Sequence, residues 1–131
     1  MKMTDEYKKE KVIEISGSAP SKCMKCGKCS ASCPNFDNMD IKPHQFVSYV
    51  LDGRVDELME SVTLFKCLSC MACVERCPRN VKPGKLIDAA RQLLIRQKDK
   101  NYLLADSVPE MCKDEDVPQQ LLVSAFRRYK R

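Results

Sequence analysis

The sequence predicts an all-α protein whose central part is built from two similar halves. Two observations predict it: apolar residues recur at helical spacing after two similar triplets, and cysteines recur in two runs of equal spacing. The composition agrees, because the 131 residues include no Trp and only four Gly, which argues against a glycine- and aromatic-rich β-domain. A chain of this length has room for one domain with additional terminal segments.

Two helices are expected directly after the triplets Ile41-Lys42-Pro43 and Val81-Lys82-Pro83. Proline suits the first turn of a helix, where its missing N–H costs nothing, and Gly53 is suited to end the first helix. A third helix is expected over residues 55–65, and it leads into the second cysteine run. The apolar positions that define these helices are Phe46, Val47, Val50, Leu51, Leu86, Ile87, Ala90, Leu93, Leu94, Val55, Leu58, Met59 and Val62.

Eight of the nine cysteines form two runs of the pattern C-x2-C-x2-C-x3-C, each followed by proline. This is the spacing of bacterial-type ferredoxins, in which three thiolates of a run hold one [4Fe–4S] cluster and the fourth binds the other cluster. We therefore expect two [4Fe–4S] clusters in an α-helical ferredoxin-like domain, since the residues between the runs have helical patterning. The expected ligands are Cys23, Cys26, Cys29 and Cys77 for the first cluster, and Cys67, Cys70, Cys73 and Cys33 for the second.

Other interpretations of the potential ligands are weaker. Structural zinc uses paired Cys-x2-Cys knuckles and needs no cysteine before proline, and disulfides are rare in a reducing compartment. A Rieske centre needs two histidines, whereas His44 is the only one and is expected at the surface or in the first turn of its helix. Cys112 lies in a polar stretch far from any second cysteine, and we expect it to be a free thiol.

Three segments are expected along the chain: an N-terminal arm over 1–18, the two-cluster domain over 19–99, and a C-terminal tail over 100–131. The arm is charged apart from a β-like patch, Val12-Ile13-Glu14-Ile15. A short helix in the tail cannot hold in water alone, so we expect it to dock on the core or on another subunit. Its apolar face comprises Leu121, Leu122, Ala125, Phe126 and Tyr129, and the basic residues at its end are Arg127, Arg128, Lys130 and Arg131.

The formal net charge is +5, and basic residues gather around the cysteines, where anionic clusters need compensation. No basic stripe interleaved with aromatic residues is present, so nucleic-acid binding is not expected. The chain has neither a membrane-length apolar run nor the apolar segment of a signal peptide, so we expect no membrane insertion and a cytoplasmic location. Because Lys22, Lys25 and Lys28 flank the first run, we expect its cluster to have the higher reduction potential.

The two cysteine runs and the triplet Ile41-Lys42-Pro43 resemble the C subunit of heterodisulfide reductase, an iron–sulfur protein found in methanogens and related anaerobes. The resemblance covers about residues 16–97. It implies that the eight cysteines are cluster ligands and that the chain carries electrons from a flavin-containing A subunit to a catalytic B subunit. In that family the B subunit contains Cys-Cys-Gly repeats and reduces the disulfide of coenzyme M and coenzyme B.

The resemblance leaves the wider role open between three alternatives. The chain could serve a heterodisulfide-reductase-like complex with a different substrate, or it could be a free two-cluster ferredoxin. A structural or regulatory cluster protein is the weakest alternative, because two linked clusters form an electron path that a structural role does not need. No catalytic residue is expected, so the chain alone should show no disulfide reduction. The N-terminal arm and the C-terminal helix favour a resident subunit over a free carrier.

Overall fold

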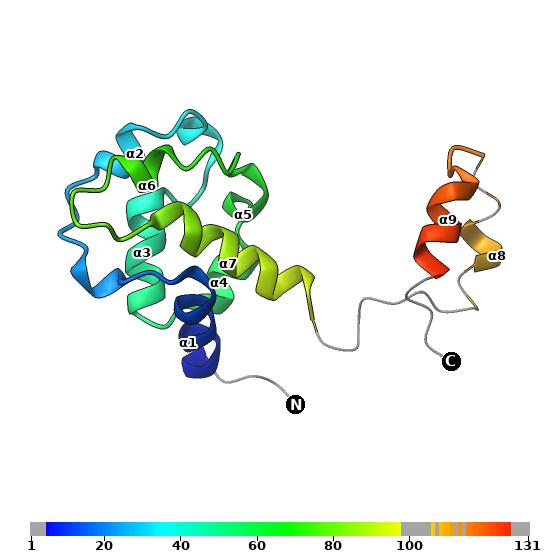
Figure 1. The fold of residues 1–131 in the computed structure, drawn as a ribbon, viewed down its shortest axis with the longest axis horizontal. Helices are drawn as coiled ribbons and strands as arrows, with labels where there is room; N and C mark the ends of the chain where they lie inside the picture. Colours follow the sequence, from blue (N-terminus) through cyan, green and yellow to red (C-terminus); the bar gives the residue numbers. More distant parts are fainter. Residues whose placement is uncertain (1–4, 98–105, 107, 112, 114, 127–131) are drawn as a thin grey trace. The chain divides into compact units, whose positions relative to one another are not determined.

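The computed structural model describes residues 5–97, 106, 108–111, 113 and 115–126, and all regular structure within them is helical (Figure 1). The all-α prediction is therefore confirmed. The chain divides into two units, residues 1–94 and 95–131, and each is described here by itself. Within the described residues, every helix is too short or too polar to cross a bilayer.

Two helices, α3 (Pro43–Leu51) and α7 (Pro83–Ile95), begin at the prolines of the repeated triplets, as predicted. Each helix buries one apolar face in the core of the first unit: Phe46 and Val47 on α3, and Leu86 and Ile87 on α7, are at most 1% exposed. Gly53 follows α3 with φ +77°, a left-handed conformation that glycine adopts without a Cβ penalty. The amphipathic pattern of the sequence therefore located the main helices of the core.

The expected single helix over 55–65 is two helices, α4 (Val55–Glu60) and α5 (Thr63–Lys66). The break falls at Ser61, whose backbone is extended (φ −70°, ψ 138°). Asp40 causes the break, because its Oδ1 accepts hydrogen bonds from Ser61 Oγ (2.6 Å), Thr63 N (3.1 Å) and Thr63 Oγ1 (2.6 Å). The turn redirects α5 so that it ends at the first cysteine of the second run.

The β-like patch expected over Val12–Ile15 is wrong, because these residues belong to α1 (Asp5–Ser16). The helix has weak amphipathicity of its own, and contacts with the rest of the unit hold it in place. Val12 is fully buried in the core, and Lys9 Nζ donates to the carbonyl oxygen of Leu51 at 2.6 Å. Lys8 adds an ion pair with Asp56 on α4. Tertiary packing thus overrode the local β propensity.

The second unit contains α8 (Val108–Met111) and α9 (Gln119–Phe126) among its described residues. The helix expected after Pro118 is therefore confirmed over 119–126, with Leu121 and Val123 more than half exposed. Cys112, Tyr129 and the basic residues at the chain's end lie outside the described residues. What the apolar face of α9 packs against remains a prediction.

Candidate metal centres

The two cysteine runs fold into the same backbone shape. Each run begins where a short helix ends: η1 (Pro20–Lys22) precedes Cys23, and α5 precedes Cys67. Both loops then use left-handed residues at equivalent positions, with φ near +54° at Lys25 and Ser69, and +74° and +60° at Gly27 and Met71. Such conformations cost about 1 kcal/mol or more at non-glycine residues and cluster at functional sites. Here they turn successive sulfurs to one side of each loop.

The last left-handed residue of each loop starts a short helix, α2 (Lys28–Ala31) or α6 (Ala72–Glu75). Each of these helices carries the third cysteine of its run. The degree of burial follows the same order in both runs: the first and fourth cysteines are half-buried, the second is exposed and the third is buried. All eight thiols are free, so both runs present a complete set of sulfur donors.

The eight thiols surround two small cavities of similar size. The first cavity is lined by the first three cysteines of the first run and by the last cysteine of the second; the second cavity has the reciprocal set. These are the groupings that the spacing predicted. The thiols of the first cavity are Cys23, Cys26, Cys29 and Cys77, and those of the second are Cys67, Cys70, Cys73 and Cys33.

The donor set and its surroundings fit an iron–sulfur group. Four soft thiol donors line each cavity, and the remaining walls are largely apolar, with Val47 and Val81 at the first and Met39 and Ile87 at the second. Backbone amides also point at the sulfurs: Lys25 N lies 3.4 Å from Cys23 Sγ, and Val81 N lies 3.3 Å from Cys77 Sγ. Amide donors to sulfur stabilise the thiolate and tune the potential of such clusters.

In the absence of iron, the two buried thiols, Cys29 and Cys73, have raised pKa values. Burial, with smaller contributions from nearby thiols such as Cys29, raises the pKa of Cys73 to about 11. Burial also raises the pKa of Cys29. The effect of Cys29 on Cys73 agrees with the packing of α2 against α6, the two helices that carry the third cysteines of the runs. Iron binding ionises coordinating thiols outright, so the binding energy must include this cost.

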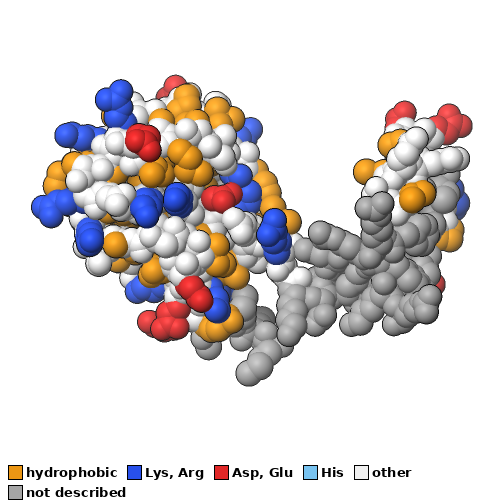
Figure 2. Space-filling model, in the orientation of Figure 1, with side chains coloured by type: hydrophobic (Ala, Val, Ile, Leu, Met, Phe, Trp, Pro, Cys, Tyr) orange, Lys and Arg blue, Asp and Glu red, His pale blue; other side chains and the backbone are white. Residues whose placement is uncertain are grey.

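Basic side chains surround both cysteine runs at the surface. Figure 2 shows Lys and Arg side chains distributed over the visible face of the first unit, with hydrophobic areas between them. Those in or beside the runs are exposed, namely Lys22, Lys25, Lys28, Lys66, Arg76 and Arg79. Two anionic four-thiolate clusters would be compensated by this charge, in agreement with the sequence argument.

The sequence argument did not anticipate an exchange of large and small residues between the cavities. His44 lies in the first turn of α3, as expected, but it also lines the first cavity together with Gly27 of the loop. At the second cavity the positions are reversed, with Gly84 on α7 and Met71 in the loop. A Cβ added to Gly84 would lie 3.0 Å from Cys73 Sγ and 3.2 Å from Met71 Sδ. A side chain at position 84 would therefore crowd both Cys73 and the large loop residue, Met71.

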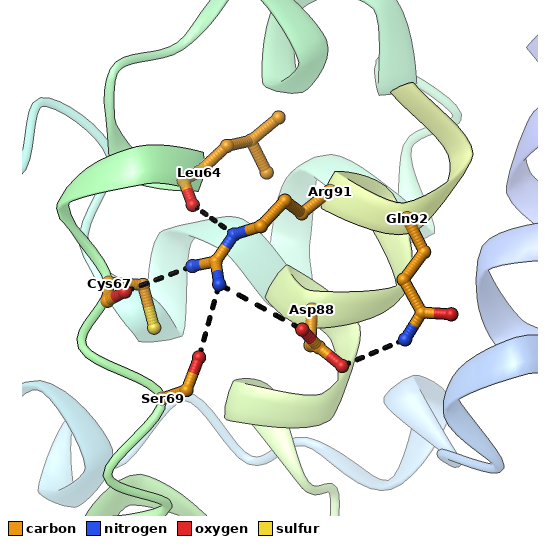
Figure 3. A network of polar contacts seen from close by, with 6 residues as sticks. All are labelled: Leu64, Cys67, Ser69, Asp88, Arg91 and Gln92. Carbon is orange, nitrogen blue, oxygen red and sulfur yellow. Dashed lines mark hydrogen bonds and ion pairs between the residues drawn. The ribbon is translucent and has the colours of Figure 1, made fainter. Parts of the chain in front are cut away.

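The polar contacts to the two loops also differ, and the sequence did not predict them. At the first cavity, Nδ1 of His44 lies 2.6 Å from the buried Ser30 Oγ, which also accepts the His44 backbone N–H at 3.2 Å. At the second, Arg91 of α7 reaches the loop, as Figure 3 shows. Its donors meet Leu64 O at 2.6 Å, Cys67 O at 2.9 Å and Ser69 Oγ at 3.2 Å. Aligning the helices as well as the cysteines would have marked position 91 as unmatched.

Comparison with known proteins agrees with this geometry. Residues 19–81 match the family model of the 4Fe-4S dicluster domain, so the chain carries two [4Fe–4S] clusters. Curated relatives include the C subunit of the H(2):CoB-CoM heterodisulfide,ferredoxin reductase of Methanothermobacter marburgensis, which is 33% identical over 66% of this chain and 47% of that protein. The iron-sulfur C subunit of the CoB--CoM heterodisulfide reductase of Methanopyrus kandleri is 32% identical over 70% of this chain and 45% of that protein.

A third relative, from Archaeoglobus profundus, is described as similar to the C subunit of heterodisulfide reductase and is 30% identical over 67% of this chain and 47% of that protein. The chain thus spans about half the length of these curated relatives. The residues that match the dicluster model include all eight cysteines of the two runs. Residues 19–81 thus form a 4Fe-4S dicluster domain, and the chain is similar to C subunits of heterodisulfide reductase over about two thirds of its own length.

Proposed function

We propose that this chain is the electron-transfer subunit of a heterodisulfide-reductase-type complex. The observation that supports this proposal is the pair of cavities. Each cavity takes its fourth cysteine from the other run, so that two redox sites share loops within one small unit. A single structural site would need only one such set. The exchange also joins the two halves, which matters because a unit this small has little core to stabilise it.

The proposed ligands are the cysteines that line each cavity. Cys23, Cys26, Cys29 and Cys77 would hold the first cluster, and Cys67, Cys70, Cys73 and Cys33 the second. When bound, each [4Fe–4S] cluster supplies a site that accepts and releases one electron. The protein's part is to fix the sulfurs, to exclude water with apolar walls and to set the potential through nearby charges and amide donors.

The contact between α2 and α6 supports transfer between the two sites. These helices pack against each other and carry Cys29 and Cys73, the two buried cysteines. In contrast, Cys26 and Cys70 are exposed, one at each cavity. An electron could therefore enter beside one exposed cysteine, cross at the buried pair and leave beside the other. This arrangement suits a relay that has a donor on one side and an acceptor on the other.

The donor and acceptor proposed here are those that the resemblance of the sequence to heterodisulfide reductase implies. We propose a flavin-containing A subunit as donor and a Cys-Cys-Gly-containing B subunit as acceptor, with disulfide reduction taking place on the latter. The chain itself would be non-catalytic. Its work would take place in the reducing cytoplasm, where eight free thiols keep their reactivity toward iron.

Anaerobic purification of the full chain under its native promoter, with a small affinity tag, tests this proposal. We expect about eight iron and eight labile sulfides per chain, together with two co-purifying subunits, one containing flavin and one with Cys-Cys-Gly repeats. Removing the chain from the complex should abolish electron transfer from the flavin to the disulfide substrate, and adding it back should restore this transfer.

Two results would contradict the proposal. A chain that purifies alone with both clusters, and accepts electrons from several unrelated donors, would indicate a free ferredoxin. Disulfide turnover by the isolated, cluster-loaded chain would place catalysis on this subunit. A complex with the expected subunits but no activity on the coenzyme M–coenzyme B disulfide would instead indicate a related complex with a different substrate.

A further inference from the structure

We propose that Arg91 is a positioning residue that raises the reduction potential of the second cluster. The inference deepens the proposed function and rests on the ligand set given above for the second cavity. It assigns to one side chain of α7 two effects on the second cysteine loop: fixing its backbone and placing a permanent positive charge beside it.

The geometry supports the first effect. The Arg91 guanidinium binds the carbonyl oxygens of Leu64 and Cys67, at the end of α5, and the hydroxyl of Ser69 in the loop that follows (Figure 3). One planar group therefore joins both sides of Cys67, the first cysteine of the run. Ser69 has a left-handed backbone, with φ +53°. The guanidinium of Arg91 thus stabilises a backbone conformation that by itself costs the loop free energy.

Charge supports the second effect. A guanidinium remains protonated at every relevant pH, so Arg91 carries its charge in both redox states of the cluster. Its side chain is only 20% exposed, which limits screening by water. Reduction adds one negative charge to the cluster, and a nearby cation stabilises that added charge.

Asp88 opposes this effect. Its Oδ1 lies 3.9 Å from Arg91 Nη1, and Gln92 Nε2 donates to its Oδ2 at 2.9 Å. The carboxylate is 39% exposed, about twice the exposure of Arg91. It therefore offsets part of the guanidinium charge from a position that water screens more strongly. Removing Asp88 and removing Arg91 should shift the potential in opposite directions.

The first half has no equivalent cation on its helix. The triplets align at an offset of 40 residues, which pairs Arg91 of α7 with Leu51 of α3. Lys and Arg are both absent from α3, whose residues are PHQFVSYVL. The lysines near the first run are exposed to solvent instead. Among the described residues, the helix of the first half therefore lacks a counterpart of the Arg91 cation.

The test is a redox titration monitored by EPR on the full chain with both clusters assembled anaerobically. A Cys70→Ala chain first identifies the signal of the second cluster. Arg91→Gln should lower the reduction equilibrium constant of that cluster about tenfold, which is ~59 mV for a one-electron couple. Arg91→Lys keeps the charge and should shift it less. Asp88→Asn should shift it in the opposite direction, and the first cluster should not move in any of the three.

Arg54→Gln is the matched control, because Arg54 forms an exposed ion pair with Glu57 away from both cavities. It should leave both potentials unchanged. Equal shifts in Arg91→Gln and Arg91→Lys, no shift in either, or loss of the second cluster in both would overturn the electrostatic assignment. A shift of the first cluster alone would also overturn it. Failure of the proposed function is distinguishable, because it would appear as purification of the unaltered chain without the two partner subunits, whatever the potentials of its clusters.

Discussion

The first half of the unit contains the first cysteine run and α3, and the second half contains the second run and α7. The two halves share a backbone conformation but differ in the side chains that line their cavities. Equivalent residues are left-handed in both loops, and equivalent cysteines are buried to similar degrees. Two equivalent positions around this common backbone differ in residue size. The first cavity has His44 on the helix and Gly27 in the loop, whereas the second has Gly84 on the helix and Met71 in the loop. The comparison shows that the sulfur positions tolerate little change, whereas the surrounding side chains can change in compensating pairs.

The polar contacts to the two halves differ in kind. The first half has a hydrogen-bonded pair, Ser30 with His44, and a set of exposed lysines. The second half has one partly buried guanidinium that is hydrogen-bonded to backbone carbonyls. Sites with the same ligands can therefore have different potentials. The sequence-based expectation that the first cluster has the higher potential remains a prediction, and Arg91 acts against it.

The largest expected effect is the loss of one cluster when its fourth cysteine is removed. Cys33→Ala should abolish the second cluster and Cys77→Ala the first, because each residue lines the cavity formed by the other run. Iron content should fall from about eight to about four per chain in each variant. Iron analysis and EPR of the two chains give the answer. Loss of the cluster on the variant's own run would mean that the cysteines do not exchange.

A methyl group at Gly84 should break the steric compensation of the second half. Alanine gains up to about 1 kcal/mol of helix propensity over glycine, but contacts of 3.0 Å to Cys73 Sγ and 3.2 Å to Met71 Sδ require the wall to move. Overpacking costs about 1–3 kcal/mol, so Gly84→Ala should destabilise the loaded chain and release the second cluster first in denaturant.

Gly17→Ala is the control for Gly84→Ala. Gly17 has φ +57° and no neighbouring atom within 4 Å of the added Cβ. It should therefore cost about 1 kcal/mol through backbone strain and leave both clusters equally stable. Equal behaviour of the two alanine variants would indicate that packing at Gly84 has no special role.

Ser30→Val should affect only the first half, where it introduces the residue that the second half has at the equivalent position, Val74. The change removes both contacts of Ser30 Oγ to His44. Because His44 is only half-buried and water can replace part of the loss, we expect a destabilisation of about 1 kcal/mol. Denaturant unfolding of the loaded chain measures it.

Ser32→Ala serves as the control for Ser30→Val, since Ser32 Oγ only donates to the carbonyl oxygen of Lys28 within the same turn. Its effect should be within about 0.5 kcal/mol. A Ser30→Val chain as stable as the Ser32→Ala chain would show that the histidine contact contributes no stability.

Asp40→Asn should have the smallest effect, and it copies Asn80 of the second half. Burial alone would raise the pKa of Asp40, but hydrogen bonds from Ser61, Thr63 and Ile41 outweigh it and lower the pKa to about 2. A carboxylate with a lowered pKa stabilises the fold above its unfolded pKa and loses this effect as the pH falls toward 2. Since Asp40 is exposed, we expect a loss below about 1 kcal/mol.

The loss in Asp40→Asn should be constant between about pH 6 and 8, because both the folded and the unfolded pKa lie below that range. Unfolding curves at the two limits, with the exposed Asp37→Asn as control, test this. A loss that grows with pH across this range would assign the effect to a different titrating group.

The sequence predicted the helices after the two triplets because their apolar residues recur at helical spacing, and it predicted the cysteine groupings because the spacing belongs to a known ligand pattern. It missed α1, since Val12 reaches the core only through tertiary packing. It also missed the break at Ser61, because the causal residue, Asp40, lies more than 20 residues earlier. It missed the role of Arg91 for a different reason: two of its partners are backbone carbonyls, which leave no trace in a residue pattern, and only an alignment of the two helices marks the position.

The exchange of Cys33 and Cys77 between the cavities also has a consequence for synthesis of the chain on the ribosome. The second cavity has its four thiols once Cys73 has been added, whereas the first cavity must wait for Cys77, the last of the eight. The half that is translated first is thus completed last. Until then three of its thiols can be exposed to the cell, so delivery of iron before the second run emerges would meet only an incomplete site.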